Sequence, residues 1–181
     1  MLEDGYISYN IKKLTNKRNN KINDYMHKSS SYIVNHLVSR NISKLIIGYN
    51  KSWKQETNIG KRNNQNFIDI PHMKFVMMLT YKCKLEGIEV ILREESYTSK
   101  CSFLDLESIC KHEKYMGKRI KRGLFKSFNK VIINADVNGS YNIMRKAIPE
   151  EFTNGIEAVI VQPLRIKPYK NKKWDIIPYN Y

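Results

Sequence analysis

Asp136 is the residue whose type and position most favour chemistry. It follows the apolar run 131–133 and begins a segment of helical spacing, with Gly139, Ile143 and Ala147 three, seven and eleven residues later. This spacing predicts that Asp136 lies on the stripe of a helix that faces the sheet. A carboxylate at a helix start is stabilised by the helix dipole, and carboxylate oxygens are ligands that Mg²⁺ prefers. The alternative is that Asp136 only caps the helix.

Two further acids, Glu94 and Glu95, directly follow the apolar run 88–92, which we predict to be a strand. Successive strand residues face opposite sides, so at most one of the two carboxylates should point into a shared cleft. Carboxylates that face one cleft could hold a divalent metal ion. The alternative is an exposed acidic pair among basic neighbours.

The segment 111–130 is strongly basic and contains three aromatic residues. The whole chain has 32 Lys and Arg against 17 Asp and Glu, a formal net charge of +15, which favours a nucleic-acid partner. Cations mixed with aromatic rings suit a phosphate backbone with stacked bases. The candidate nucleic-acid-binding residues are Lys118, Arg119, Lys121, Arg122 and Lys126. The alternatives are a solvated hairpin with Tyr115, Phe125 and Phe128 packed inward, and a soluble basic protein whose charge reflects only its Lys-rich composition.

The three cysteines, Cys83, Cys101 and Cys110, predict neither a disulfide framework nor a zinc site. An odd number without a secretory signal indicates a reducing, cytoplasmic location. Structural zinc needs four N or S ligands, and Cys101, Cys110 and His112 supply at most three. Cys83 falls among apolar residues and is expected in the core. No run of about 18 apolar residues occurs, so we expect no membrane partner.

An α/β fold is expected to position these residues. Residues 7–40 read as one long helix, because apolar residues recur at helical spacing: Ile11, Leu14, Ile22, Tyr25, Met26, Ile33 and Leu37. Two apolar runs, 44–48 and 88–92, are separated by a helix that begins at Pro71 and ends at Gly87. This order predicts a βαβ unit with parallel neighbouring strands.

The remaining segments are expected to be less regular. Residues 49–70 read as a polar loop, and residues 93–129 as an inserted hairpin or loop module. A final helix is predicted over 136–147, in which Asn138 and Asn142 either orient nearby groups or are surface polar residues. The tail after residue 150 is expected to be extended and partly disordered.

Four stretches together resemble the TnpB (OrfB) family of insertion-sequence proteins. They are KRNNKINDYMHKSS at 17–30, YNKSWKQETNIGKRNNQNF at 49–67, EESYTSKCSFLD at 94–105 and INADVNGSYNIMRKA at 133–147. TnpB proteins are RNA-guided DNA endonucleases related to Fanzor and to type V CRISPR effectors. The resemblance implies an incomplete RuvC-like domain of the RNase H fold, with an inserted loop module in place of a zinc finger. Members usually fold this insertion around zinc with two Cys-x-x-Cys pairs, whereas here Leu104 stands where the partner of Cys101 would be.

The resemblance also assigns roles to the acids. It implies that Asp136 is the last catalytic acid. Members usually carry a middle Glu at the strand end where this chain has Gly48, while some branches carry it just before the Tyr-Thr-Ser motif. Glu95 is favoured for that role, with Glu94 second. Glu95 and Asp136 would then be ligands of an incomplete Mg²⁺ site.

The first catalytic Asp of the family lies in a strand upstream of the long helix, whereas Asp4 has no apolar strand around it. We therefore expect an N-terminally truncated copy, divided into a partial core at 1–93, a basic module with a degenerate zinc-finger region at 94–130, a final RuvC-like segment at 131–168 and a basic tail at 169–181. Its lineage activity is RNA-guided, metal-dependent DNA cleavage within a transposable element, with DNA and guide RNA as partners, and the copy is expected to be inactive alone. The alternatives are a non-catalytic nucleic-acid-binding remnant, or one half of a split nuclease whose N-terminal half is encoded separately.

Overall fold

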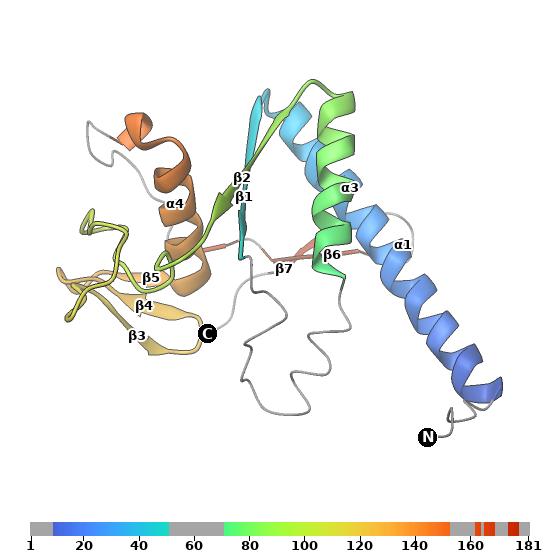
Figure 1. The fold of residues 1–181 in the computed structure, drawn as a ribbon, viewed down its shortest axis with the longest axis horizontal. Helices are drawn as coiled ribbons and strands as arrows, with labels where there is room; N and C mark the ends of the chain where they lie inside the picture. The colour runs from blue at the N-terminus through green and yellow to red at the C-terminus, as the bar shows by residue number, and fades with distance from the viewer. Residues whose placement is uncertain (1–8, 51–70, 153–161, 164, 169–173, 178–181) are drawn as a thin grey trace, which may run out of the picture. The chain divides into compact units, whose positions relative to one another are not determined.

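The computed structural model describes residues 9–50, 71–152, 162–163, 165–168 and 174–177. Their elements in chain order are α1 (Tyr9–Ser39), β1 (Lys44–Tyr49), α3 (His72–Leu85), β2 (Glu89–Glu94), β3 (Lys118–Lys121), β4 (Leu124–Lys126), β5 (Ile132–Asn134), α4 (Ala135–Ala147), η1 (Pro149–Phe152), β6 (Arg165–Pro168) and β7 (Trp174–Ile177) (Figure 1). The fold is mixed α/β, as predicted. The chain divides into two compact units, residues 1–43 with 58–88 and residues 44–57 with 89–181. Asp4 and nearly all of the predicted loop at 49–70 lie outside the described residues.

The first unit is built on the helix pair α1 and α3, which pack against each other. Both helices were predicted, and Gly87, with a φ of 71°, follows α3 in the left-handed conformation that favours glycine. The buried stripe of α1 is Met26, Ser30, Val34 and Leu37. Of the apolar residues predicted for the N-terminal half of α1, Ile11 and Leu14 are exposed and Ile22 is half-buried. Among the described residues the physical reason is length, because α3 has 14 residues and cannot cover a helix of 31.

The second unit contains the parallel strand pair β1 and β2, as the βαβ pattern predicted. Leu45 lies beside Val90 and Ile47 beside Leu92 in the register. Helix α4 contacts both strands. The carboxyl ends of the two strands therefore lie next to each other and next to the helix that carries Asp136.

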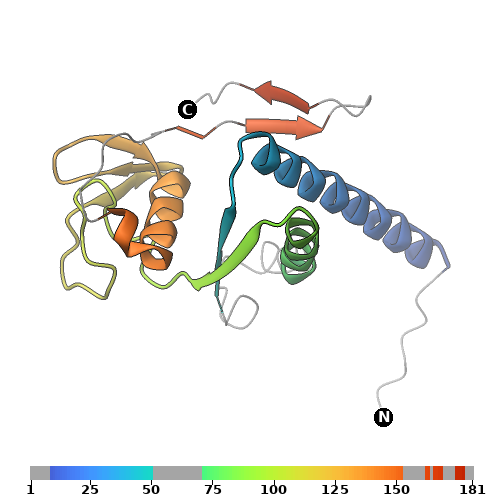
Figure 2. The ribbon, with the colours of Figure 1, turned by 90° about the horizontal axis from the view of Figure 1, so that it is seen from above.

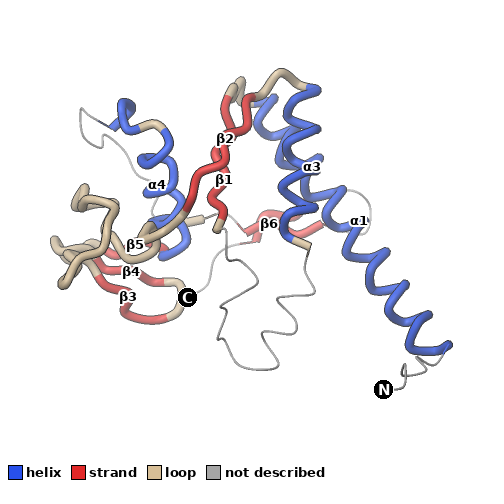
Figure 3. Tube along the Cα trace, in the orientation of Figure 1, coloured by secondary structure: helices blue, strands red, loops and turns tan. Residues whose placement is uncertain are grey.

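A three-stranded antiparallel sheet, β3–β4–β5, forms most of the regular structure between β2 and α4. Figure 3 shows the long loop that precedes it in tan. Phe125, Ile133 and Ala135 form its buried core, against which Leu104 and Tyr141 pack. The predicted hairpin is thus present, and the apolar run 131–133 contributes a third strand that leads directly into α4.

The C-terminal strands β6 and β7 form an antiparallel pair (Figure 2). Their register places Ile166 opposite Ile176. The prediction that the tail is extended is confirmed for these two segments.

Candidate active site and nucleic-acid interface

One pocket in the second unit brings together the two acids favoured from the sequence. Its volume is about 380 Å³. It is lined by Glu95 from the loop after β2, by Arg119 from β3, and by Asp136, Gly139 and Ile143 from α4. Segments far apart in the sequence thus meet at the ends of the parallel strands, where α/β folds commonly place their sites.

Gly48, at the end of β1, leaves the space that the Glu95 side chain uses. A Cβ atom at residue 48 would lie 3.0 Å from Glu95 Oε2 and 2.6 Å from Ile143 Cδ1. The second distance is shorter than real Cβ contacts, so a side chain at residue 48 would force Ile143 to move. The lack of a side chain at residue 48 therefore leaves room for Glu95 in this position.

Glu94 faces away from this pocket and binds other partners. Its carboxylate accepts hydrogen bonds from Lys146 Nζ at 2.8 Å and from the Ser96 backbone N–H at 2.9 Å, and it also contacts the Ser96 hydroxyl. The hydrogen bonds from Lys146 and Ser96 lower the pKa of Glu94 to about 2. The alternation of strand residues explains why Glu94 and Glu95 point to different surroundings.

The ion pair between Glu94 and Lys146 predicts that stability depends on pH. The folded pKa lies below the ordinary value of 4.5, so the pair stabilises the fold above pH 4.5, and this stabilisation is lost as the pH falls towards 2. Both side chains are partly exposed, so the contribution is about 1 kcal/mol or less. We expect a Lys146→Met variant to raise the Glu94 pKa towards 4.5 in an NMR titration. Lys28→Met, which removes the partner of Asp24, is the control, and an unchanged Glu94 pKa in Lys146→Met would contradict the pairing.

Asp136 is not the cap of α4. Asn134 is the N-cap residue, and its Oδ1 accepts the backbone N–H groups of Asp136 at 2.9 Å and Val137 at 3.2 Å. The Asp136 side chain is 85% exposed and lies 4.0 Å from Arg119, measured from Oδ1 to Nη2. The capping alternative is therefore wrong, and the carboxylate is available at the pocket wall.

The prediction that Asp136 lies on the sheet-facing stripe is also wrong. The buried stripe of α4 is Ala135, Asn138, Gly139 and Asn142. Two of these four residues are asparagines, so the helix is oriented by hydrogen bonds as much as by apolar contacts. The helical spacing does place Asp136, Gly139 and Ile143 on one side of α4, where all three line the pocket.

Asn138 and Asn142 orient the loop that follows Glu95 and are not surface residues. Asn138 donates to the Cys101 carbonyl at 2.9 Å and accepts the Phe103 N–H at 2.9 Å. Asn142 donates to the carbonyls of Thr98 at 2.9 Å and Cys101 at 2.8 Å. Both asparagines are fully buried. They fasten residues 98–103 to α4, and this fixes the loop after Glu95 relative to Asp136.

The predicted nucleic-acid-binding residues gather on the hairpin of β3 and β4. Their side chains are exposed at Lys118, Arg119, Lys121 and Arg122 and half-buried at Lys126. Lys118 lies directly opposite Lys126 in the register. Like charges at opposite positions are destabilising in an isolated sheet, so this pairing favours a polyanionic partner.

The aromatic residues of the basic segment do not behave as one group. Phe125 is 1% exposed and packs inward, Phe128 is 68% exposed, and Tyr115 is half-buried. The inward-packed alternative is therefore confirmed for Phe125 and wrong for Phe128.

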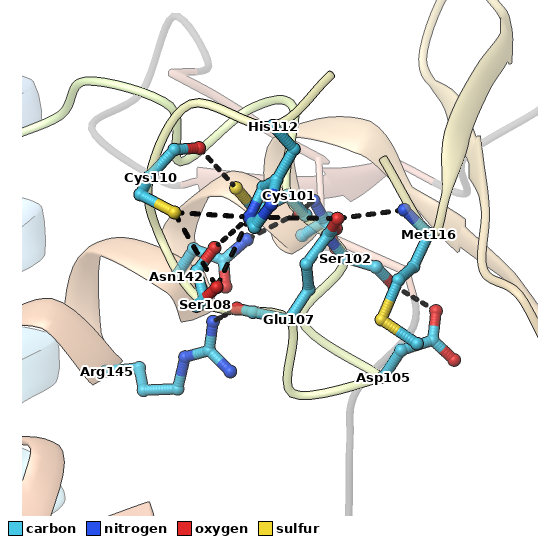
Figure 4. Close-up of polar contacts among 11 residues, drawn as sticks. Cys101, Ser102, Asp105, Glu107, Ser108, Cys110, His112, Met116, Asn142 and Arg145 are labelled. Atoms are coloured by element: carbon cyan, nitrogen blue, oxygen red, sulfur yellow. Dashed lines mark hydrogen bonds and ion pairs between the residues drawn. The ribbon is translucent and has the colours of Figure 1, made fainter. Parts of the chain in front are cut away.

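The residues weighed for zinc lie in a polar cluster (Figure 4). Cys110 Sγ lies 3.4 Å from His112 Nε2, and Cys101 Sγ lies 3.6 Å from the Cys110 carbonyl. Among the residues that the structure describes, no three His, Cys, Asp or Glu side chains are grouped so that they could hold a metal ion. Cys83, in contrast, is buried in α3, as predicted.

A carboxylate missed in the sequence holds this cluster. Glu107, which is 5% exposed, accepts the backbone N–H of Ser102 at 2.7 Å and that of Met116 at 2.8 Å. Its position among polar loop residues gave no signal, because the partners are backbone groups that only the folded chain brings close.

No helix in the described part of the chain combines the length and apolarity needed to cross a bilayer.

Comparisons with known proteins concern the family and the fold. Residues 72–143 match the family model described as Cas12f1-like, TNB domain. No curated protein matches the chain. The fold is similar to a chain in the cryo-EM structure of a Cas12f1–sgRNA–target DNA complex, with a TM-score of 0.60 and 20% sequence identity. The match covers 78% of this chain and 37% of that chain, so the present chain spans well under half of its relative. The family match runs from α3 through the Asp136 motif, so this part of the chain is similar to the TNB domain of Cas12f1-like proteins, and the fold is similar to that of Cas12f1.

Proposed function

We propose that the chain carries part of a RuvC-like nuclease site, and that it belongs to a transposon-encoded lineage of RNA-guided, metal-dependent DNA endonucleases acting in the cytoplasm. The observation that carries this proposal is the pocket, because Glu95, Asp136 and Arg119 all line it. DNA and a guide RNA are the proposed partners. The similar Cas12f1 chain was solved with an sgRNA and target DNA, which supports both.

The donors in this pocket fit Mg²⁺. Two carboxylates line it, together with the hydroxyl residues Ser96 and Ser140. Mg²⁺ takes oxygen ligands, keeps several waters and is commonly bound through one or two carboxylates plus substrate phosphates. Glu95 and Asp136 would hold the ion, which when bound supplies Lewis-acid stabilisation and an activated water. Arg119 would orient the phosphate by charge-assisted hydrogen bonds.

The Gly48 geometry supports Glu95 as the middle acid. TnpB relatives usually carry that Glu at the end of the strand corresponding to β1, where this chain has Gly48. Here the Glu95 carboxylate reaches within 3.0 Å of the Cβ position of residue 48. The carboxylate of Glu95, which follows β2, thus reaches the space beside the end of β1. This is required if Glu95 replaces a Glu that relatives carry at the end of β1.

Mn²⁺ binding tests this proposal, because Mn²⁺ shares the oxygen preference of Mg²⁺ and is visible by electron paramagnetic resonance. We expect Glu95→Gln and Asp136→Asn each to weaken Mn²⁺ binding by about tenfold or more, since each removes a charged ligand. Glu94→Gln is the matched control and should leave binding unchanged. Equal effects of Glu94→Gln and Glu95→Gln would contradict the assignment.

A second candidate function is nucleic-acid binding without cleavage. It is favoured by the guanidinium of Arg119, which lies 4.0 Å from Asp136 and partly balances its charge. Metal binding separates the two candidates, because a partial nuclease site holds a metal ion whether or not the chain alone cleaves DNA. Nucleic-acid binding together with Mn²⁺ binding that is lost in Asp136→Asn supports the nuclease site, and nucleic-acid binding without Mn²⁺ binding supports the second candidate.

A further inference from the structure

We propose that a second pocket, next to the first, receives an unpaired nucleobase of single-stranded nucleic acid. This inference rests on the proposed function, because it concerns the strand whose phosphate lies at Glu95 and Asp136. The second pocket has a volume of about 320 Å³, and Ser99 and Arg119 line both pockets. The two pockets are therefore neighbours, with Arg119 between them.

The wall of this second pocket, the base pocket, combines aromatic residues with cations. The half-buried Tyr115 supplies aromatic surface beside the buried Phe125, while Lys100, Lys118 and Arg119 surround it with positive charge. A nucleotide has the complementary chemistry, since its base presents flat apolar faces and its phosphate is anionic. The volume lies at the lower end of the range for small-molecule sites, which suits one base better than a large ligand.

Phe125 forms a rigid part of this wall because of Gly117. A Cβ atom at residue 117 would lie 2.3 Å from Phe125 Cε1, so only glycine lets the backbone approach the ring. Phe125 also packs with Ile133 in the core of the small sheet. The buried Phe125 therefore fixes the backbone of this wall, and the half-buried Tyr115 is the ring that a base can contact.

Tyr115 is braced by the polar cluster of Figure 4. Its ring contacts the His112 ring edge to face, with centroids 5.3 Å apart and an interplanar angle of 81°. His112 Nε2 lies 2.8 Å from the Ser108 carbonyl, which can only accept, so Nε2 carries the proton in this contact. Glu107 holds the backbone of the next residue through the Met116 N–H. The polar cluster that contains Cys110 and His112, in the region expected to be a degenerate zinc finger, thus positions one wall of the base pocket.

Comparing a normal strand with an abasic strand of the same length tests for base binding. The probes are a fluorescently labelled ten-nucleotide oligothymidylate and its abasic counterpart, titrated with the full chain. We expect the wild type to bind the normal strand about five- to a hundredfold more tightly, the usual effect of stacking one base on an aromatic ring. In Tyr115→Ala this preference should fall close to one, while binding of the abasic strand stays the same.

Phe128→Ala is the matched control, because Phe128 is an exposed aromatic residue of the same basic segment that does not line the pocket. It should retain the preference. Tyr115→Leu, which keeps an apolar side chain, should lose the preference while retaining the wild-type circular dichroism spectrum, and this excludes misfolding as the cause.

Equal binding of the two strands by the wild type would overturn the base pocket, as would equal losses in Tyr115→Ala and Phe128→Ala. A poly-glutamate peptide that binds with the same dependence on Tyr115 would also overturn it, in favour of an acidic protein partner. Failure of Mn²⁺ binding in the wild type would instead count against the proposed function, so the two failures are distinguishable.

Discussion

Replacing the three cations of β3 with alanine, in Lys118→Ala, Arg119→Ala and Lys121→Ala combined, should weaken binding of single-stranded nucleic acid by on the order of a hundredfold at low salt. Each phosphate contact releases bound counterions, with a slope of about 0.7 per contact for single strands. The variant should therefore reduce the slope of log affinity against log salt by about two. These side chains are exposed on one strand, so their removal leaves the core intact.

A charge-matched variant separates a local interface from the effect of net charge. Lys12, Lys13 and Lys17 are exposed on α1, in the other unit of the chain. Replacing them with alanine removes the same total charge, and we expect less than half of the change in salt slope. Equal changes in the two variants, measured by fluorescence anisotropy at several salt concentrations, would show that binding is unspecific and that β3 is not the interface.

Asn138→Ala should cost about 2–4 kcal/mol of stability, the largest effect we expect from a single substitution. The side chain is fully buried and makes two hydrogen bonds to the backbone, one to the Phe103 N–H and one to the Cys101 carbonyl. Truncation leaves the Phe103 N–H buried without that acceptor. The loop after Glu95 should loosen as a result, so hydrogen exchange of the Phe103 amide should accelerate together with the loss of stability.

Two substitutions on the same helix make this test specific. Ser140→Ala removes an exposed hydroxyl that donates to the Asp136 carbonyl of its own helix, and it should change stability by about 0.5 kcal/mol or less. Asn138→Asp keeps the acceptor for Phe103 but places a carboxylate oxygen against the Cys101 carbonyl, so it should destabilise at least as much as alanine. Urea denaturation compares the three variants, and wild-type stability in Asn138→Ala would show that the loop is held by other contacts.

The main elements of the fold could be predicted because their signals are local. The order of apolar runs and a helix predicted the parallel pair β1 and β2, and the alternation of strand residues predicted that Glu94 and Glu95 would face different surroundings. Both inferences depend only on geometry within a few residues.

The parts that could not be predicted depend on contacts across the fold. The exposed N-terminal part of α1 has the same apolar spacing as its buried part, and among the described residues α3, with 14 residues, is too short to cover all 31 of α1. Asn138, Asn142 and Glu107 look like surface residues in sequence, because their partners are backbone groups distant in the chain. The contact of Gly48 with Glu95 likewise appears only when two strands are side by side.

Radical cleavage of the protein backbone tests directly whether Glu95 and Asp136 hold a divalent metal ion in one pocket. Fe²⁺ bound in place of Mg²⁺ generates hydroxyl radicals with ascorbate and peroxide, and these cleave the protein backbone close to the ion. We expect cuts next to residues 95 and 136, suppressed by excess Mg²⁺ and lost in Asp136→Asn. Cuts concentrated at residues 107–112 instead, or cuts that persist in Asp136→Asn, would contradict it.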